Sequence, residues 1–378
     1  YLCRKLYSGI NHIFHTSNLC RNIFDESNNY MSGVQIIEVD DDGQDQRLDR
    51  FLRRTFPELG QGRIEKMCRK GECRVDGSRV KASTRLSVGQ TVRVPPLPDT
   101  KDMPRDTATA KITKADAQMI RDAVLYKDDY IIAINKPAGL AVQGGSGQMR
   151  HVDGLSAALK FDLENKPKLV HRLDKDTSGV LLLARTGLAA SGLTKAFQSR
   201  ETRKIYWAAV AGCPHPKIGT IKYGLIKAGG HGPNGSGEKM QCIHPSEVTD
   251  MPDAKHATTD YTVLEDVGKR ASWVALVPIT GRTHQLRAHM AELGNPIVGD
   301  GKYGTNTQTN DGDGWGAQLG GDISRKMHLH ARSITFTHPI TKKEIHITAE
   351  LPDHMEKTWT TFGWEVKYAP VDPFEVYK

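Results

Sequence analysis

The densest group of side chains that could do chemistry lies in residues 170–178, directly before the apolar run that ends at residue 184. Asp174 stands in this segment between the cations Arg172 and Lys175. Nearby cations favour the ionised form of a carboxylate, and an ionised, partly desolvated aspartate can act as a nucleophile. Loops at strand ends are where rigid scaffolds present such groups. The residues alone leave a commoner alternative open, namely a turn aspartate that accepts local backbone hydrogen bonds.

A second polar cluster occupies residues 280–290. His284 and His289 are five residues apart, so on a helix they diverge by roughly 140° and do not form a zinc pair. Arg287 lies between them and is a candidate buried partner for a carboxylate, because its guanidinium is a fixed fork that matches one. The alternative is an exposed helix with ordinary cations. We expect no metal site.

The motifs argue against two other classes of enzyme site. Residues 144–147, Gly-Gly-Ser-Gly, lack the Lys and Ser/Thr that follow the glycines of a P-loop. The Gly-x-Ser-x-Gly nucleophile elbow of a serine hydrolase does not occur. We expect residues 144–147 to form a mobile loop on the substrate side.

The spacing of apolar residues predicts the strands and helices that could position these side chains. Short apolar runs predict strands over residues 130–134, 180–184, 204–210 and 273–278, and helical spacing predicts helices over 188–197 and 284–293. The mixture lacks the regular strand-helix alternation of a doubly wound sheet. We therefore predict an α+β fold with a mostly antiparallel mixed sheet over residues 121–378. Residues 224–257, rich in Gly, Pro and charge, are expected to be an inserted loop.

A small basic unit is predicted over residues 44–95. Apolar residues from Leu48 to Phe56 recur at helical spacing, and a second short helix surrounds Ile64 and Met67. Asp-Gly at 76–77 predicts a hairpin, and residues 91–94 add a strand. Thirteen Lys and Arg against six acids give the unit a net charge of 13 − 6 = +7. Such clustering makes a phosphate backbone as partner about as good an explanation as a merely solvated face, and the candidate contacts are Arg50, Arg53, Arg54, Arg63, Lys66, Arg69 and Lys70.

The remaining segments set the limits of these units. Residues 1–43 are expected to be an N-terminal extension without fixed structure, and the Pro-rich residues 96–120 a linker. The chain has 378 residues, a formal net charge of +8 and six cysteines. No apolar run approaches the roughly 20 residues of a membrane span, and six cysteines in so long a chain suggest reduced thiols. A bacterial-type cytoplasmic location is expected, with the mitochondrion as the alternative if residues 1–30 are a transit segment.

Four motifs in order resemble those of the RluA family of pseudouridine synthases. Residues 171–179, His-Arg-Leu-Asp-Lys-Asp-Thr-Ser-Gly, resemble its signature, and residues 135–139, Asn-Lys-Pro-Ala-Gly, its first motif. Residues 204–206, Lys-Ile-Tyr, resemble the motif that holds its active-site tyrosine, and residues 281–289 its arginine motif. Residues 44–95 resemble the S4 RNA-binding domain found in several members. The resemblance spans about residues 44 to 350 and is closest to the RluC branch, which modifies large-subunit ribosomal RNA.

The resemblance implies an isomerase that detaches uracil from ribose in RNA and rejoins it through carbon. It makes Asp174 the essential carboxylate, either attacking ribose C1′ or assisting the departure of uracil. It makes Arg287 the partner that keeps Asp174 ionised, Tyr206 the ring that stacks on uracil and helps to remove the C5 proton, and Arg172 the side chain that fills the gap of a flipped-out base. It implies RNA as the partner, no cofactor and, in our reading, a monomer.

Two departures and two alternatives bear on the target. Gln143 stands where many relatives carry His, and residues 224–257 are longer and richer in glycine than expected. Both concern substrate choice rather than the reaction. A synthase acting on transfer RNA is one alternative. A non-catalytic S4-type RNA-binding or ribosome-assembly protein, which would explain residues 44–95 equally well, is the other.

Overall fold

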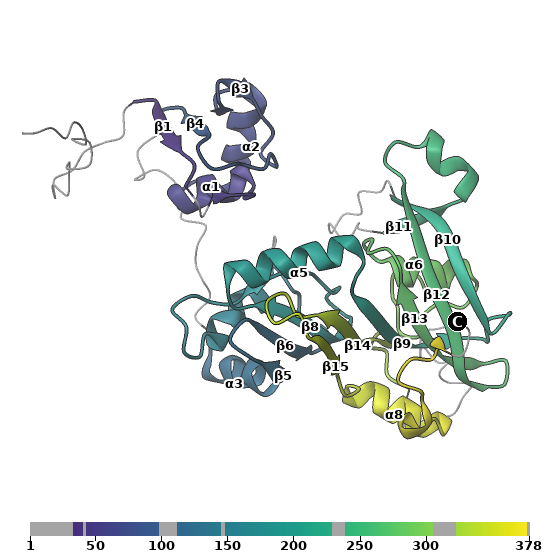
Figure 1. Cartoon of the computed structure of the whole chain (residues 1–378). Coiled ribbons are helices and arrows are strands. Elements are labelled where there is room, and N and C mark those ends of the chain that lie inside the picture. The colour runs from purple at the N-terminus through teal and green to yellow at the C-terminus, as the bar shows by residue number, and fades with distance from the viewer. Residues whose placement is uncertain are drawn as a thin grey trace, which may run out of the picture. The chain divides into compact units, whose positions relative to one another are not determined.

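The computed structural model of the protein describes residues 33–40, 43–97, 112–144, 148–228, 239–304 and 323–375. The chain divides into two compact units, one up to residue 108 and the other from residue 109 onward (Figure 1). The expectations for residues 1–30 and for most of the glycine loop at 144–147 lie outside the described residues.

The N-terminal unit combines two helices with a small sheet. Helices α1 (Leu48–Thr55) and α2 (Gln61–Lys70) accompany strands β1 (Gln35–Glu38), β2 (Arg74–Val75), β3 (Ser78–Arg79) and β4 (Thr91–Val94), in the sheet order β1-β4-β2-β3. Their apolar faces share a core that includes Phe51, Ile64 and Met67. Asp76 and Gly77 both have positive φ, 45° and 76°, as the two central residues of a type I′ turn require. The helices and the hairpin lie where apolar spacing and turn chemistry predict them.

Strand β1 corrects the expected N-terminal boundary. It lies within residues 1–43, predicted to lack structure, yet it pairs antiparallel with β4 from Gln35↔Val94 to Glu38↔Thr91. Val39 follows it into the core at 1% exposure. A four-residue strand is too short to show periodicity, and its partner lies more than fifty residues away along the chain. The N-terminal unit therefore includes residues 35–38, which precede its predicted start at residue 44.

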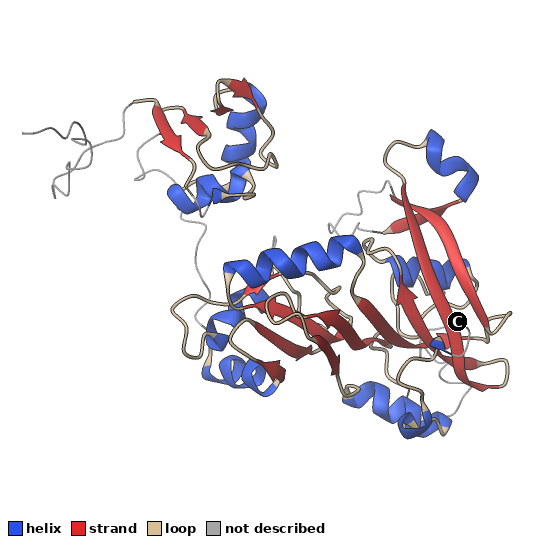
Figure 2. Cartoon of the chain, in the orientation of Figure 1, coloured by secondary structure: helices blue, strands red, loops and turns tan. Residues whose placement is uncertain are grey.

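A long mixed sheet organises the C-terminal unit, which confirms the α+β prediction (Figure 2). Its described strands follow the order β11-β10-β12-β13-β9-β14-β8-β6-β5, with β15 beside β14 and β7 beside β8. Strands β14 and β8 pair in parallel, and the other described pairings are antiparallel. The strands are β5 (Val124–Lys127), β6 (Ile131–Lys136), β7 (Lys168–Leu169), β8 (Ser178–Ala184), β9 (Arg203–Ala211), β10 (Ile218–Lys227), β11 (Met240–Ile243), β12 (Lys255–Val267), β13 (Ala271–Pro278), β14 (Leu329–Thr337) and β15 (Glu344–Thr348).

Helices cover both faces of this sheet, which explains the unbroken apolar runs of its central strands. Val180 and Leu182 of β8 pack with α5 (Gly187–Ser199), whereas Leu181 and Leu183 pack with α3 (Lys114–Asp122) and α4 (Val152–Leu155). A strand buried on both faces loses the usual alternation of polar and apolar residues. The remaining helices are α6 (Gln285–Glu292), α8 (Asp353–Phe362) and the 3₁₀ turns η3 (Ser156–Leu159), η4 (Pro245–Asp250) and η6 (Val366–Tyr368).

Two further predicted boundaries are wrong. Helix α3 begins at Lys114, inside the predicted linker 96–120, and Thr113 caps it by accepting a hydrogen bond from the Asp116 amide at 3.0 Å. The predicted inserted loop 224–257 contains the end of β10, all of β11, η4 and the start of β12. Strand β11 pairs with β10 from Gly224↔Ile243 to Lys227↔Met240. The high Gly and charge content of residues 224–257 as a whole conceals this edge strand, whose outer side has no sheet partner in the described residues.

The described helices include none with the length and apolarity that crossing a bilayer would require.

Candidate active site

A cleft of about 510 Å³ collects the three side chains singled out for catalysis. Asp174 reaches it from the loop before β8, Tyr206 from β9 and Arg287 from α6. The cleft wall also includes His171, Arg172, Lys204, Arg282 and His284. The structure thus brings together residues that lie up to 113 positions apart in the sequence.

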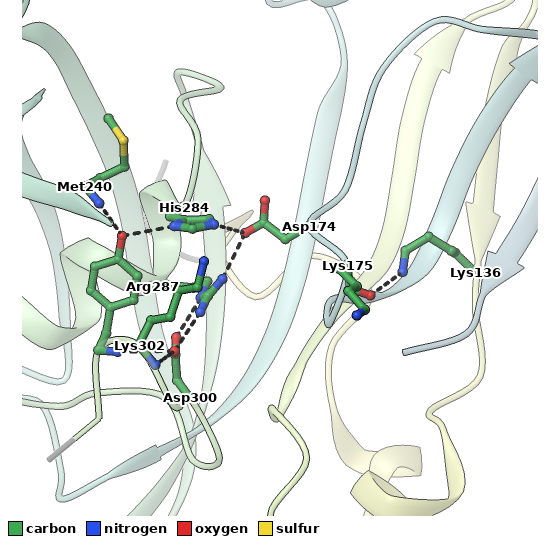
Figure 3. A network of polar contacts seen from close by, with 9 residues as sticks. Lys136, Asp174, Lys175, Met240, His284, Arg287, Asp300 and Lys302 are labelled. Carbon is green, nitrogen blue, oxygen red and sulfur yellow. Dashed lines mark hydrogen bonds and ion pairs between the residues drawn. The ribbon is translucent and has the colours of Figure 1, made fainter. Parts of the chain in front are cut away.

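A buried lysine anchors the loop that carries Asp174. Lys136, at the end of β6, is 0% exposed. Its Nζ donates to the carbonyl oxygens of Pro137 (2.9 Å), Leu140 (2.9 Å) and Lys175 (3.0 Å), as Figure 3 shows in part. Burial lowers the pKa of Lys136 to about 7, against the carboxylates of Asp176 and Asp174, which raise it. The residue after Asp174 is therefore tied to a rigid strand.

A glycine fixes where this loop enters the sheet. Gly179, the second residue of β8, has φ +107°, and a Cβ there would lie 2.2 Å from the Ala331 carbonyl oxygen. Gly179 and Ala331 are opposite one another where β8 and β14 pair in parallel. Only glycine allows this approach, and the preceding Ser178 Oγ is 2.9 Å from His330 Nδ1. The glycine of the signature thus sets the path of the strand that follows the catalytic loop.

Arg287 is held mainly by an acid that sequence reasoning missed. Its Nε and Nη2 donate to Asp300 at 2.6 and 2.7 Å, while its Nη1 lies 3.5 Å from Asp174 Oδ2 (Figure 3). Burial disfavours the charged guanidinium, but the hydrogen bonds and charge of Asp300, with Asp174, outweigh it and raise the pKa of Arg287. The expected pairing with Asp174 exists, but Asp300 is the closer partner.

Asp300 is itself fully fixed. Its side chain is 0% exposed, and it also accepts the backbone N–H of Lys302 at 2.9 Å. The preceding Gly299 has φ +73°, and a Cβ there would meet the Lys326 carbonyl oxygen at 2.1 Å. The sequence signal for Asp300 was its position between Gly299 and Gly301. That position indicates a role only once the structure shows a buried arginine beside it.

Tyr206 is a neutral phenol beside the carboxylate. Burial, and then the negative charge of Asp174, raise the pKa of Tyr206 above its usual range. The side chain therefore offers a ring face and a protonated hydroxyl to the cleft.

Arg172 is exposed at the cleft wall, and the residue before it is rigid. His171 accepts the Leu182 amide hydrogen at its Nε2 (2.8 Å) and stacks on Phe197 with 4.3 Å between ring centroids. Burial lowers the pKa of His171 to about 3, which keeps the ring neutral.

The other seven candidate RNA contacts belong to the N-terminal unit. Six of them are exposed and Arg63 is half-buried. Arg54 forms an ion pair with Asp40 at 2.6 Å, and Lys70 lies 3.6 Å from Glu72. The set is Arg50, Arg53, Arg54, Arg63, Lys66, Arg69 and Lys70.

Comparison with known proteins identifies the family of this chain. The sequence profile described as RNA pseudouridylate synthase matches residues 130–292. The ribosomal large subunit pseudouridine synthase C of Vibrio vulnificus is 34% identical over 330 residues, covering 87% of this chain and 97% of the relative. RNA pseudouridine synthase 4, mitochondrial, of Arabidopsis thaliana is 36% identical over 337 residues, covering 75% and 69%.

A solved structure has the same architecture. Human RNA pseudouridylate synthase domain containing 4 is 28% identical, with a TM-score of 0.52, covering 65% of this chain and 95% of that chain. The chain therefore belongs to the RNA pseudouridylate synthase family, isomerases that convert uridine to pseudouridine, as its RluA-type motifs predicted.

Proposed function

We propose that this enzyme isomerises uridines of large-subunit ribosomal RNA and that Asp174 is its reacting carboxylate. The observation that carries the proposal is the placing of Asp174 in the cleft, 18% exposed, with Arg287 directed at one of its oxygens. The names of the relatives from Vibrio and Rickettsia support the ribosomal target.

The chemistry requires only rearrangement within one nucleotide. The C1′–N1 bond breaks, a C1′–C5 bond forms, and one proton moves from C5 to N1, so no oxidant or external group is consumed. Asp174 either bonds to C1′ or stabilises positive charge there as uracil leaves. Both roles need a negatively charged carboxylate, and Arg287 Nη1 lies 3.5 Å from its Oδ2.

We assign stacking on uracil to the ring of Tyr206. A protonated phenol cannot take the C5 proton until it has lost its own, and the charge of Asp174 opposes that loss. Removal of the C5 proton by Tyr206, the second role that the resemblance implies, therefore belongs late in the reaction, after the C1′–C5 bond has formed.

The target base must leave the RNA stack to reach Asp174, which costs a few kcal/mol. We assign Arg172 to the space that the base vacates. We also propose that the N-terminal unit is an S4-type domain whose cations bind RNA phosphates. Contacts remote from the reacting atoms can offset the cost of base flipping.

Neutralising three cations of α2 tests the role of this unit. Replacing Lys66, Arg69 and Lys70 with Gln should reduce the slope of log Kd against log salt concentration by about 2–3, because each phosphate contact releases counterions. A matched triple in the other unit, Gln at the exposed positions Lys114, Lys343 and Lys357, should leave the slope unchanged. Equal slopes for both variants would show that the α2 cations are solvated surface.

The target is tested by mapping pseudouridines in cells with and without the gene. We expect sites to disappear from large-subunit ribosomal RNA and transfer RNA to remain unchanged. Loss from transfer RNA alone would establish the first alternative. Unchanged RNA with impaired ribosome assembly would establish the non-catalytic one.

We propose that the protein is a monomer and that it is located in a bacterial-type cytoplasm. The mitochondrion stays the alternative, since the Arabidopsis relative carries that location in its name.

A further inference from the structure

The ring of His284 lies between Asp174 and a tyrosine (Figure 3). Its Nε2 is 3.9 Å from Asp174 Oδ2, and its Nδ1 is 3.1 Å from the hydroxyl of Tyr303. The side chain is 9% exposed, and the backbone at His284, the residue before α6, is left-handed with φ 52°. Left-handed backbone at a non-glycine residue is uncommon and is kept where the surroundings require it.

The hydroxyl of Tyr303 is the hydrogen-bond partner of His284 Nδ1, so its own contacts bear on which ring nitrogen carries the proton. The Met240 amide in β11 donates to the Tyr303 hydroxyl oxygen at 2.7 Å. Burial raises the pKa of Tyr303 to about 12, so the hydroxyl keeps its own proton and, with the Met240 N–H at its oxygen, can donate that proton to His284 Nδ1. An imidazole that accepts at Nδ1 carries its proton on Nε2 when neutral. Burial lowers the pKa of His284, although the charge of Asp174 acts in the opposite direction. The lowered pKa favours the neutral ring.

We propose that His284 is a positioning residue for the reaction: it presents a neutral Nε2–H to Asp174, in a tautomer fixed by Tyr303. The inference rests on the proposed role of Asp174 as the reacting carboxylate. The nearest nitrogens of His284 and Arg287 both lie closest to the same oxygen of Asp174, Oδ2. Oδ1 is thereby left for the nucleotide. At 3.9 and 3.5 Å the donors do not yet bind tightly, and a movement of less than about 1 Å would make both contacts full hydrogen bonds.

This network joins β11 to the reacting carboxylate. Met240 lies in the segment 224–257 that was expected to be a loop. Its amide is the first member of a chain that runs through Tyr303 and His284 to Asp174. The segment thus has a role in preparing the carboxylate as well as in completing the sheet.

Two substitutions separate this role from a purely structural one. The amide nitrogen of Gln reaches the position of the imidazole Nε2, whereas that of Asn reaches the position of Nδ1. Asn, however, tolerates left-handed backbone better than Gln does. If His284 acts through Nε2–H, His284→Gln should keep kcat within about 10-fold of wild type, and His284→Asn should lose about 100-fold with KM changed less than about 2-fold. If His284 serves only the backbone, Asn should be at least as active as Gln, which would overturn the proposal.

A measurement on the resting protein makes the test independent of activity. In protein labelled with ¹⁵N-histidine, the His284 ring, assigned by its loss in His284→Asn, should show its proton on Nε2. Tyr303→Phe keeps the aromatic ring over Arg287 and removes the hydroxyl, so it should weaken that preference and lower kcat by about 10-fold. A proton on Nδ1 in wild type, or no change in tautomer in Tyr303→Phe, would refute the assignment. Full activity in an Asp174 variant would instead refute the proposed function and leave the tautomer result standing.

Discussion

Replacing Asp174 with Asn is expected to lower kcat for pseudouridine formation by at least about 10⁴-fold, on the scale seen when an enzyme loses its reacting side chain. The amide has nearly the same shape but cannot carry the negative charge that either form of the mechanism needs. Arg287 keeps both hydrogen bonds to Asp300, so the buried cation stays paired and the fold should be retained. RNA affinity should change by less than about 2-fold, because phosphate contacts carry most of it.

The matched control is Asp176→Asn, an exposed acid two residues along the same loop. It removes the same charge near the same cations without touching the cleft-facing carboxylate. Single-turnover assays with enzyme in excess would compare the two variants directly. Near-normal turnover by Asp174→Asn, or an equal loss in both variants, would contradict the assignment of Asp174.

The second large effect is expected at Asp300. Replacing Asp300 with Ala leaves Arg287, 4% exposed, without its closest partner and with Asp174, at 3.5 Å, as its remaining acidic partner among the described residues. Removing one member of a buried ion pair costs about 3–5 kcal/mol, because the other charge stays desolvated. The free energy of unfolding should fall by that amount, and turnover should fall with it as Arg287 loses its orientation.

A double variant separates charge burial from packing. Arg287→Met with Asp300→Leu removes both charges and fills the space with apolar atoms, which is often neutral for stability. Denaturant unfolding should therefore show the double variant to be more stable than Asp300→Ala, while its activity remains low. Stability equal to wild type in Asp300→Ala would mean that the pair is not the anchor of Arg287.

Much of this fold was predictable because its signals are local. Helix α5, the central strand β8 and the hairpin at Asp76-Gly77 each carry their pattern within a few consecutive residues. The position of Asp174 before a buried strand was equally visible. Strand β1 was not, since its four residues are specified by pairing with β4. Residues 224–257 misled because most of their glycines lie between β10 and β11, and the four residues of β11, Met-Gln-Cys-Ile, are too few to show a pattern of their own.

The site divides in the same way. Asp174, Tyr206 and Arg287 were found through motifs, and the structure brings them to one cleft. Asp300, Lys136 and the tautomer of His284 depend on partners distant in sequence, such as the carbonyl of Lys175, which patterning cannot supply. Sequence therefore identified groups that line the cleft better than the groups that hold them in place.

The hydrogen bond from Met240 to Tyr303 also bears on how the protein avoids self-association. Strand β11 ends the described sheet, and an outer strand with free amides invites a neighbouring chain to add to it. The Met240 amide is occupied by a phenol instead. The hydroxyl that we propose to orient the imidazole therefore also covers one free amide of the edge strand, and removing it should affect solubility as well as turnover.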